Sequence, residues 1–306
     1  MSAAGIAEIL DFTFYPFGNA YVANDAENLP GCAPVECRVE GFYSFYNESA
    51  LNVTDWSICT DGEARACWQS TCGPGTKLGQ DACTAGDFVY QHGPGEGLAD
   101  VLEACAMQSV GSKSDFPAYW PFVYCFEGVA LPKMGAYPGM AYGLAKDQAS
   151  FEQAFGVPST SFLDAVNATM AAAETCAAST GLDWGAIAAC ADPTVSADGQ
   201  LAFGALGAQL ESDMAWATVQ ASMESPDPIP HTYTPWVVFQ GRPIFFPSDD
   251  DAYGYADLLS WVCAAYDGPS ELPEGCPENP TPIPAAYIDY PAPTLAPTAA
   301  VEAGGR

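Results

Sequence analysis

Cysteine is the residue type with the most potential chemistry in this chain. The 306 residues include 12 cysteines but only 2 histidines. Zinc sites combine C-x-x-C pairs with further cysteines or histidines at fixed spacing. No C-x-x-C occurs here, and the closest pairs, Cys32 with Cys37 and Cys67 with Cys72, each have four residues between them. An even number of cysteines without metal-ligand spacing predicts disulfides and an oxidising compartment, with no metal and no cofactor.

The two histidines predict no catalytic triad. Neither His92 nor His231 stands at motif spacing from a serine or cysteine nucleophile, so each is expected to make structural hydrogen bonds. His231 opens the segment 231–241, which reads His-Thr-Tyr-Thr-Pro-Trp-Val-Val-Phe-Gln-Gly. A turn, an X-Pro step and an apolar β-branched run are typical of the proline loop that faces the redox cysteines of a thioredoxin-like domain. The segment therefore indicates half of a thiol–disulfide site.

The charge of the chain excludes two classes of partner. There are 8 Lys and Arg residues against 38 Asp and Glu residues, a formal net charge of −30. Such a surface repels nucleic acid and anionic membranes, so neither is expected to bind. The sequence also has no apolar run long enough for a membrane span. We interpret the acidity as a source of solubility.

Periodic patterns predict the elements that position these residues. Residues 10–15 and 87–91 alternate in the way that strands do. Residues 97–107 predict a helix, and the stretch from about 149 to 223 has a helical period. A β-hairpin and a final helix are expected over 236–266. This order predicts an α/β fold in which a helical block interrupts a sheet.

Two segments differ from the rest in composition. Residues 21–84 hold six cysteines with little periodicity, which predicts a disulfide-stapled insertion with little regular structure. Residues 277–306 are rich in Pro, Ala and Thr, which predicts an extended disordered tail. Because six cysteines lie inside the insertion and six outside it, we expect six disulfides and no free thiol. Three N-x-S/T triplets are candidates for N-glycosylation: Asn47, Asn52 and Asn167.

Five pieces of the chain match one family in order. They are Tyr15–Ala20 (Tyr-Pro-Phe-Gly-Asn-Ala), Gln91-His92-Gly93 followed by Glu96 and Glu103-Ala104-Cys105, Phe122–Glu127, Pro230–Val237, and Leu258–Gly268 with Cys276 beyond. Together they resemble the gamma-interferon-inducible lysosomal thiol reductase family. The resemblance implies a thioredoxin-like domain over 1–20 and 85–276. It also implies a helical insertion over about 97–223 in a DsbA-like arrangement, an extra disulfide-rich loop insertion at 21–84, and a missing first strand.

The resemblance also implies roles for particular residues. Thr234 and Pro235, joined by a cis peptide, would face the substrate, and His231 would help to shape that loop. The other implied site residues are the signature block Gln91, His92, Gly93 and Cys105 and the disulfide Cys263–Cys276. The implied partner is a disulfide-containing or extended polypeptide. The implied location is the secretory pathway, in a lysosome or vacuole or outside the cell.

The chain departs from the family at its redox centre. Tyr90 and Gly97 stand where relatives have two cysteines that we expect to pair with each other, and Asp100 replaces an asparagine. The family's C-x-x-C would lie before Met1, so we expect this chain by itself to be inactive as a reductase. Three hypotheses follow: an N-terminally truncated thiol reductase, a redox-inactive secreted protein that binds extended peptides, and a structural glycoprotein dominated by its insertion. We favour the first, because loss of an interior strand is costly for a folded sheet.

Overall fold

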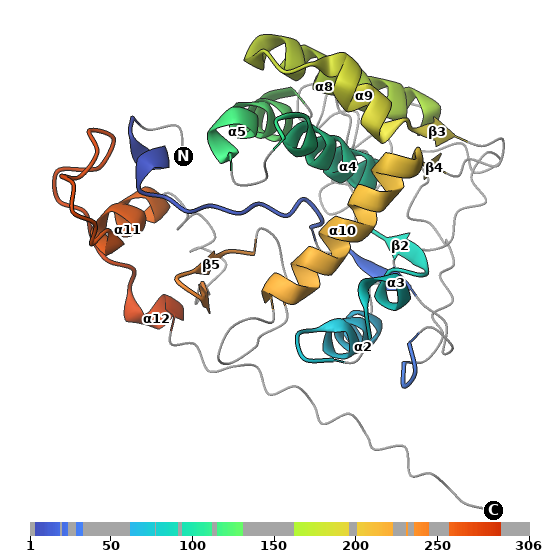
Figure 1. Ribbon diagram of the computed structural model, residues 1–306, viewed down its shortest axis with the longest axis horizontal. Helices are drawn as coiled ribbons and strands as arrows, with labels where there is room; N and C mark the ends of the chain where they lie inside the picture. The colour runs from blue at the N-terminus through green and yellow to red at the C-terminus, as the bar shows by residue number, and fades with distance from the viewer. Residues whose placement is uncertain are drawn as a thin grey trace, which may run out of the picture.

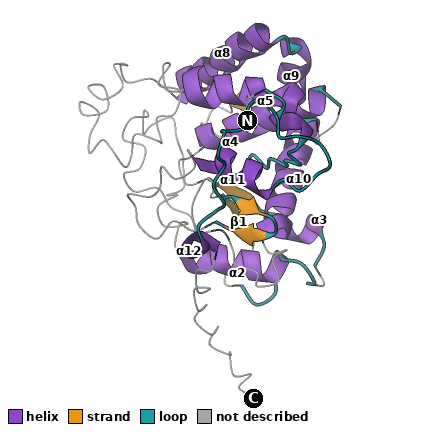
Figure 2. Cartoon of the chain, turned by 90° about the vertical axis from the view of Figure 1, so that its left-hand side faces the viewer, coloured by secondary structure: helices purple, strands orange, loops and turns teal. Residues whose placement is uncertain are grey.

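Helices make up most of the architecture in the computed structural model (Figure 1). The structure describes residues 4–18, 20–23, 29–32, 62–76, 78–90, 94–111, 115–130, 162–195, 201–222, 231, 236–244 and 257–288. Figure 2 shows α4, α5, α8 and α9 at one end and α2, α3 and the strand β1 at the other. Helix α10 crosses between these two ends in Figure 1.

Helix α4 (Pro94–Ser109) lies at the centre of the core. The helices packed against it are α5 (Phe116–Cys125), α8 (Phe162–Thr180), α9 (Trp184–Ala191) and α10 (Ala205–Ser222). Its buried apolar side chains surround the helix and include Leu98, Val101, Leu102, Ala106 and Met107. A helix that is apolar on all sides is typical of a position inside a core. The prediction of a helix over 97–107 is confirmed, and α8, α9 and α10 confirm the helical period between 149 and 223 within the described part of that stretch.

The strands are short and form three separate antiparallel pairs among the described residues. The pairs are β1 (Tyr21–Ala23) with β2 (Asp87–Val89), β3 (Thr194–Val195) with β4 (Leu201–Ala202), and β5 (Val238–Phe239) with β6 (Arg242–Pro243). Strand β2 and the β5–β6 hairpin lie where the sequence predicted strands. The fold is therefore mixed α and β, while the thioredoxin-like sheet stays a prediction.

The strand predicted over residues 10–15 is wrong. These residues are extended but belong to no strand, and the first strand begins later, at Tyr21. Phe12 and Phe14 both pack edge-on against Trp120, with ring centroids 5.2 and 5.8 Å apart. Alternation thus correctly placed the two side chains on one face. It carries no information about whether a neighbouring strand is present to complete a ladder.

Disulfides join many of these elements. They are Cys32–Cys67, Cys72–Cys83, Cys105–Cys190, Cys125–Cys176 and Cys263–Cys276. No cysteine in the described ranges is free, and Cys37 and Cys59 lie outside those ranges. None of these described pairs joins the Cys-rich segment to the rest of the chain, as the even counts suggested. The last pair is the one that the family resemblance implied.

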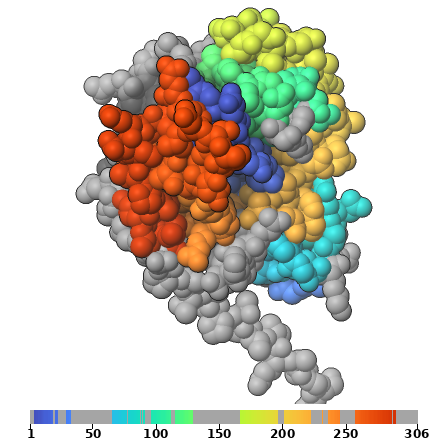
Figure 3. Space-filling view, turned by 60° about the vertical axis from the view of Figure 1, so that its left-hand side comes forward, coloured from blue at the N-terminus to red at the C-terminus, as the bar shows by residue number. Residues whose placement is uncertain are grey.

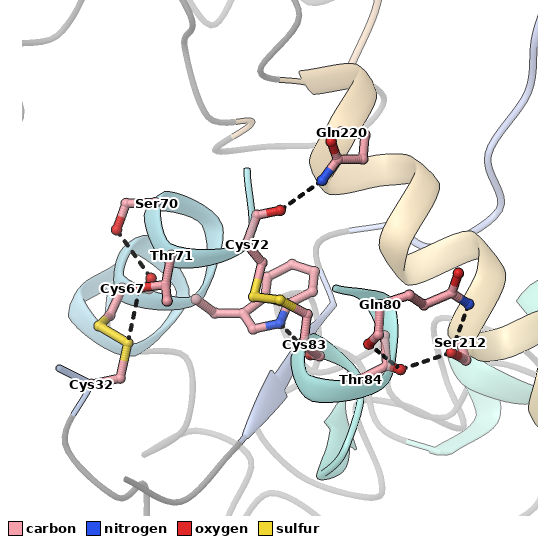
Figure 4. Close-up of a disulfide and its surroundings, with 11 residues drawn as sticks. Cys32, Cys67, Ser70, Thr71, Cys72, Gln80, Cys83, Thr84, Ser212 and Gln220 are labelled. Atoms are coloured by element: carbon pink, nitrogen blue, oxygen red, sulfur yellow. Dashed lines mark hydrogen bonds between the residues drawn. A yellow bond between two sulfur atoms is a disulfide. The ribbon is translucent and has the colours of Figure 1, made fainter. Parts of the chain in front are cut away.

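The Cys-rich segment is more regular than we expected. Helix α2 (Gly62–Cys72) and helix α3 (Gln80–Cys83) occupy its second half, and Figure 4 shows both beside α10. Gln220 of α10 donates to the carbonyl oxygen of Cys72 at 2.7 Å, and Gln80 donates to Ser212 at 3.0 Å (Figure 4). The prediction of little regular structure is therefore wrong for this half, because helix packing and side-chain bonds add to the disulfides.

The chain beyond residue 276 also differs from the prediction of a disordered tail. Residues 277–288 follow α11 (Leu258–Ala265) and end in the short helix α12 (Ala285–Ile288). Ser260 accepts a hydrogen bond from the backbone of Thr281 at 2.7 Å, and the rings of Trp261 and Tyr287 lie 5.8 Å apart. This C-terminal part covers one face of the molecule beside the N-terminal segment (Figure 3). Residues 289–306 lie outside the described residues.

Candidate functional site

His231, which begins the predicted substrate-facing loop, is buried with 1% of its surface exposed. Gln69 of α2 places its Nε2 atom 3.1 Å from the ring Nδ1 and 3.1 Å from the carbonyl oxygen of His231. Gln69 is itself 2% exposed. The structure thus joins the start of the loop to the Cys-rich segment, which is 162 residues away in sequence.

Gly18 brings two of the family-like pieces into contact. It has a φ of +56°, in the left-handed region that favours glycine, and a Cβ atom there would lie 2.7 Å from Oε1 of Glu96. The Pro-Phe-Gly turn therefore packs directly against the residue that follows the signature block. The Gly18 backbone also faces His231, so three pieces of the family pattern meet at one point.

The surroundings of His231 keep its ring neutral. Burial and the positive charge of Arg65 on α2 lower the pKa of His231, the Gly18 backbone opposes them, and the result is a pKa of about 4. Its Nε2 is buried and has no hydrogen bond of ordinary geometry among the described residues. We call His231, Gln69, Arg65 and Gly18 the His231 junction.

Of the predicted substrate-facing loop, the structure describes only the first and last residues, His231 and Trp236. The rings of His231 and Trp236 lie with centroids 6.5 Å apart. Thr234 and Pro235, the residues expected to face the substrate, lie outside the described residues. The structure therefore describes the two residues that flank this segment in the sequence, while the substrate surface and the cis peptide stay predictions.

The signature block is described in part. Gln91, His92 and Gly93 lie outside the described residues. Cys105 is 1% exposed and bonded to Cys190, so it links α4 to α9 and is not available as a nucleophile. Among the glycosylation candidates, Asn167 is exposed on α8, whereas Asn47 and Asn52 fall outside the described ranges.

The three departures from the family pattern lie together in space. A Cβ atom at Gly97 would lie only 2.5 Å from the ring of Tyr90. The tyrosine ring thus fills the space that a side chain at position 97 would need. Tyr90 then donates to Glu211 of α10 at 2.5 Å. Positions 90 and 97 are therefore neighbours in this chain, and the pairing of two cysteines there in relatives stays a prediction.

Several carboxyl groups begin at this contact and interact with one another, and we call Asp100, Glu103, Glu127 and Glu211 the acid cluster. Glu103 is buried, Asp100 and Glu211 are partly buried, and Glu127 is exposed. Burial raises the pKa of Glu211 to about 7, against the hydrogen bond from Tyr90. Burial also raises the pKa of Asp100, and Glu96, Glu127 and Glu211 raise it further. Burial and the neighbouring Glu127 and Asp100 do the same for the pKa of Glu103. The cluster therefore favours protonated carboxyl groups.

Sequence reasoning missed Gln69 and Arg65. Both lie in the segment that we interpreted as an insertion, and nothing in the sequence links α2 to a histidine so far along the chain. In the described ranges, no group of three or more His, Cys, Asp or Glu side chains is arranged to hold a metal ion. No helix there is long and apolar enough to cross a membrane. The arrangement can hold a loop in place, but it presents no thiol.

Comparisons with known proteins bear on the central part of the chain. A profile of the family described as gamma interferon inducible lysosomal thiol reductase matches residues 69–137. This match confirms the resemblance to that family over residues 69–137. The matched region includes the signature block and the Phe122–Glu127 piece. It begins at Gln69, inside the predicted insertion.

A protein from Arabidopsis thaliana described as a gamma-interferon-responsive lysosomal thiol protein is 40% identical to the chain over 47 residues. This match covers 15% of the chain and 18% of the Arabidopsis protein. The chain thus matches less than a fifth of this relative's length. No solved structure matches the chain.

Proposed function

We propose that this chain supplies the substrate-facing surface of a thiol–disulfide oxidoreductase that reduces disulfides in polypeptides. The observation that carries the proposal is the match of residues 69–137 to the thiol reductase family. The His231 junction supports it, because three family-like pieces converge where the proline loop begins. The proposed substrate is an extended polypeptide that contains a disulfide.

The chemistry of such an enzyme is thiol–disulfide exchange. The thiolate of one cysteine attacks a sulfur of the substrate disulfide, which forms a mixed disulfide and releases the other substrate sulfur as a thiolate. A second enzyme thiol then attacks the mixed disulfide, which leaves the substrate fully reduced and the enzyme pair oxidised. The proline loop would hold the substrate backbone alongside this pair as an added strand.

This chain does not contain the pair that the reaction needs. No C-x-x-C occurs in its 306 residues, and each described cysteine is already in a disulfide. In our proposal the chain holds the substrate, and the reactive pair comes from outside residues 1–306. We expect the chain alone to show no turnover in a disulfide-reduction assay.

A second candidate is a redox-inactive, disulfide-rich protein that binds extended peptides. The replacement of a cysteine pair by Tyr90 and Gly97 favours it, because their close packing leaves no room for a side chain at position 97. Both candidates predict peptide binding, and they differ in the source of thiols. The transcript upstream of the Met1 codon separates them. An in-frame C-x-x-C supports the oxidoreductase, and an in-frame stop without that motif contradicts it.

The binding surface common to both candidates can be tested on the chain itself. A fluorescent peptide with one internal disulfide should bind to the chain, and Pro235→Ala should weaken binding roughly tenfold, about 1.4 kcal/mol. Leu272, an exposed residue near the C-terminus, provides a matched control, and Leu272→Ala should leave binding unchanged. Binding that is insensitive to Pro235→Ala would contradict the proposed surface.

The proposed location is an oxidising compartment of the secretory pathway, lysosomal, vacuolar or extracellular. The described disulfides fit such a compartment, because thiols in the cytosol are kept reduced. Glycosylation at Asn167, whose side chain is exposed, would be a covalent record of passage through it. Mass analysis of the protein from its native source, before and after glycosidase treatment, tests this location.

A further inference from the structure

The amide of Gln69 contacts two atoms of one residue at the start of the predicted loop. Its Nε2 lies 3.1 Å from both the ring Nδ1 and the carbonyl oxygen of His231. A carbonyl oxygen only accepts hydrogen bonds, so the glutamine atom facing it has to be the NH₂ group. The same NH₂ group faces Nδ1, and Nδ1 is therefore also an acceptor. This geometry puts the ring proton on Nε2.

Helix α2 holds Gln69 rigidly. Cys67 and Cys72 lie on either side of it, and their disulfides run to Cys32 and Cys83. Between them, Trp68 is 1% exposed and donates its indole N–H to the carbonyl oxygen of Cys83 at 2.8 Å. Figure 4 shows these bonds and the contact of Cys72 with Gln220 of α10. A short helix that is fastened by disulfides on both sides of Gln69 can position a side chain that reaches beyond it.

His231 depends on this side chain for its orientation. Gln69 contacts the ring at Nδ1, and the Gly18 backbone is a further, weaker contact because Nε2 has no hydrogen bond of ordinary geometry within the described residues. The second contact, to the carbonyl oxygen, fixes the peptide group that leads into residues 232–235. Both contacts are buried, so water does not replace them readily when they are lost.

We propose that Gln69 is a positioning residue that sets the direction of the substrate-facing loop through its two hydrogen bonds to His231. The proposal rests on the proposed function of that loop. It gives the Cys-rich segment a role beyond stability, because the helix that carries Gln69 becomes part of the binding surface's support.

The state of the His231 ring tests the positioning directly. With only 2 histidines in the chain, the ring nitrogens can be followed by ¹⁵N NMR. Wild-type His231 should carry its proton on Nε2. In Gln69→Leu the ¹⁵N signal of Nδ1 should shift, because Nδ1 loses its hydrogen-bond donor. Gln80→Leu is the matched control: Gln80 is a partly buried glutamine of the same segment that bonds to Ser212 and Asp213 of α10, and its loss should leave the ring unchanged.

A second variant keeps the test decisive if Gln69→Leu folds poorly. In Gln69→Glu a carboxylate faces Nδ1 and cannot donate, so the ring has to donate instead. His231 should then carry a proton on Nδ1 and become cationic in mildly acidic solution. A ring that stays neutral with its proton on Nε2 in Gln69→Glu, or an unchanged Nδ1 signal in Gln69→Leu, would overturn the proposal.

The affinity for the disulfide-containing peptide tests whether the position of His231, set by Gln69, matters for substrate binding. Gln69→Leu should weaken binding roughly tenfold, whereas Gln80→Leu should not. If the Nδ1 signal shifts in Gln69→Leu but peptide affinity matches wild type, the positioning role is wrong and the proposed function stands. If wild-type chain does not bind the peptide, the proposed function is wrong, and the role of Gln69 in substrate positioning falls with it.

Discussion

The His231 junction and the acid cluster are both buried polar regions, yet the same burial moves their protons in opposite directions. At the junction, burial lowers the pKa of a base, so His231 stays neutral by remaining unprotonated. Beside α4, burial raises the pKa of acids, so the carboxyl groups become neutral by taking up protons. His231 and the carboxyl groups of the acid cluster are therefore both neutral where burial is strongest, each in a different pH range.

The difference has a consequence for stability. A base with a lowered pKa in the folded state loses stability as pH falls from its ordinary value toward the folded one. An acid with a raised pKa loses stability as pH rises through the corresponding range. The junction thus favours neutral solution and the acid cluster favours acidic solution. The cluster has more titrating groups, so we expect its preference to dominate.

The largest expected effect comes from removing charge in the acid cluster. As pH rises from 4.5 toward 7, the pKa shift of Glu211 alone costs about 3 kcal/mol of unfolding free energy, and Asp100 and Glu103 act in the same direction. The double variant Asp100→Asn, Glu211→Gln should be more stable than wild type at neutral pH and less sensitive to pH. Urea unfolding across this range measures both. Glu174→Gln, at an exposed position on α8, is the control, and equal pH slopes in all three proteins would contradict the account.

The next effect in size is that of His231. Between its ordinary pKa of 6.5 and its folded pKa of about 4, falling pH should cost about 3 kcal/mol through this residue. In wild type the acid cluster partly hides this loss. The comparison is therefore best made in the background of the double variant above, where His231→Gln should remove the remaining loss of stability in acid. A loss that persists without His231 would show that another group causes it.

Gly18→Ala tests the meeting point of the three pieces. The left-handed backbone costs about 1 kcal/mol for alanine, and the collision of the new methyl group with Glu96 should bring the total loss to about 2 kcal/mol. Gly75→Ala separates the two causes, because Gly75 also has a positive φ, of +81°, but has nothing within 4 Å of its Cβ position. Equal losses in thermal unfolding would mean that the contact with Glu96 contributes nothing.

The smallest effect concerns the contact between Tyr90 and Gly97. Gly97→Ala gains helix propensity but forces a methyl group into the tyrosine ring, so we expect a net loss of about 1 kcal/mol. In a Tyr90→Leu background the same substitution should be neutral or stabilising, because the ring is gone. Denaturant unfolding of the four proteins forms a double-mutant cycle. A cycle without coupling would contradict the close packing of this pair.

The sequence predicted local features well where a side-chain pattern determines them. The apolar residues around α4 indicated its helix, and the even cysteine counts indicated the division of the disulfides. The side-chain pattern gave a wrong prediction where the structure depends on distant partners. Residues 10–15 alternate as a strand does, but they pair with no neighbouring strand. The link between Gln69 and His231 could not be foreseen either, because it depends on packing between segments far apart in the chain. For this reason we interpreted residues 21–84, which include Gln69, only as an insertion.

The central claim is that the segment between His231 and Trp236 forms a substrate-facing surface held in place by the His231 junction. Photo-crosslinking tests it most directly, with a disulfide-containing peptide that carries a photoreactive group and mass-spectrometric mapping of the attachment sites on the chain. The account predicts crosslinks within 231–236 that weaken in Gln69→Leu and persist in Gln80→Leu. Crosslinks confined to a distant exposed apolar residue such as Tyr124 or Leu206, or unaffected by Gln69→Leu, would contradict it.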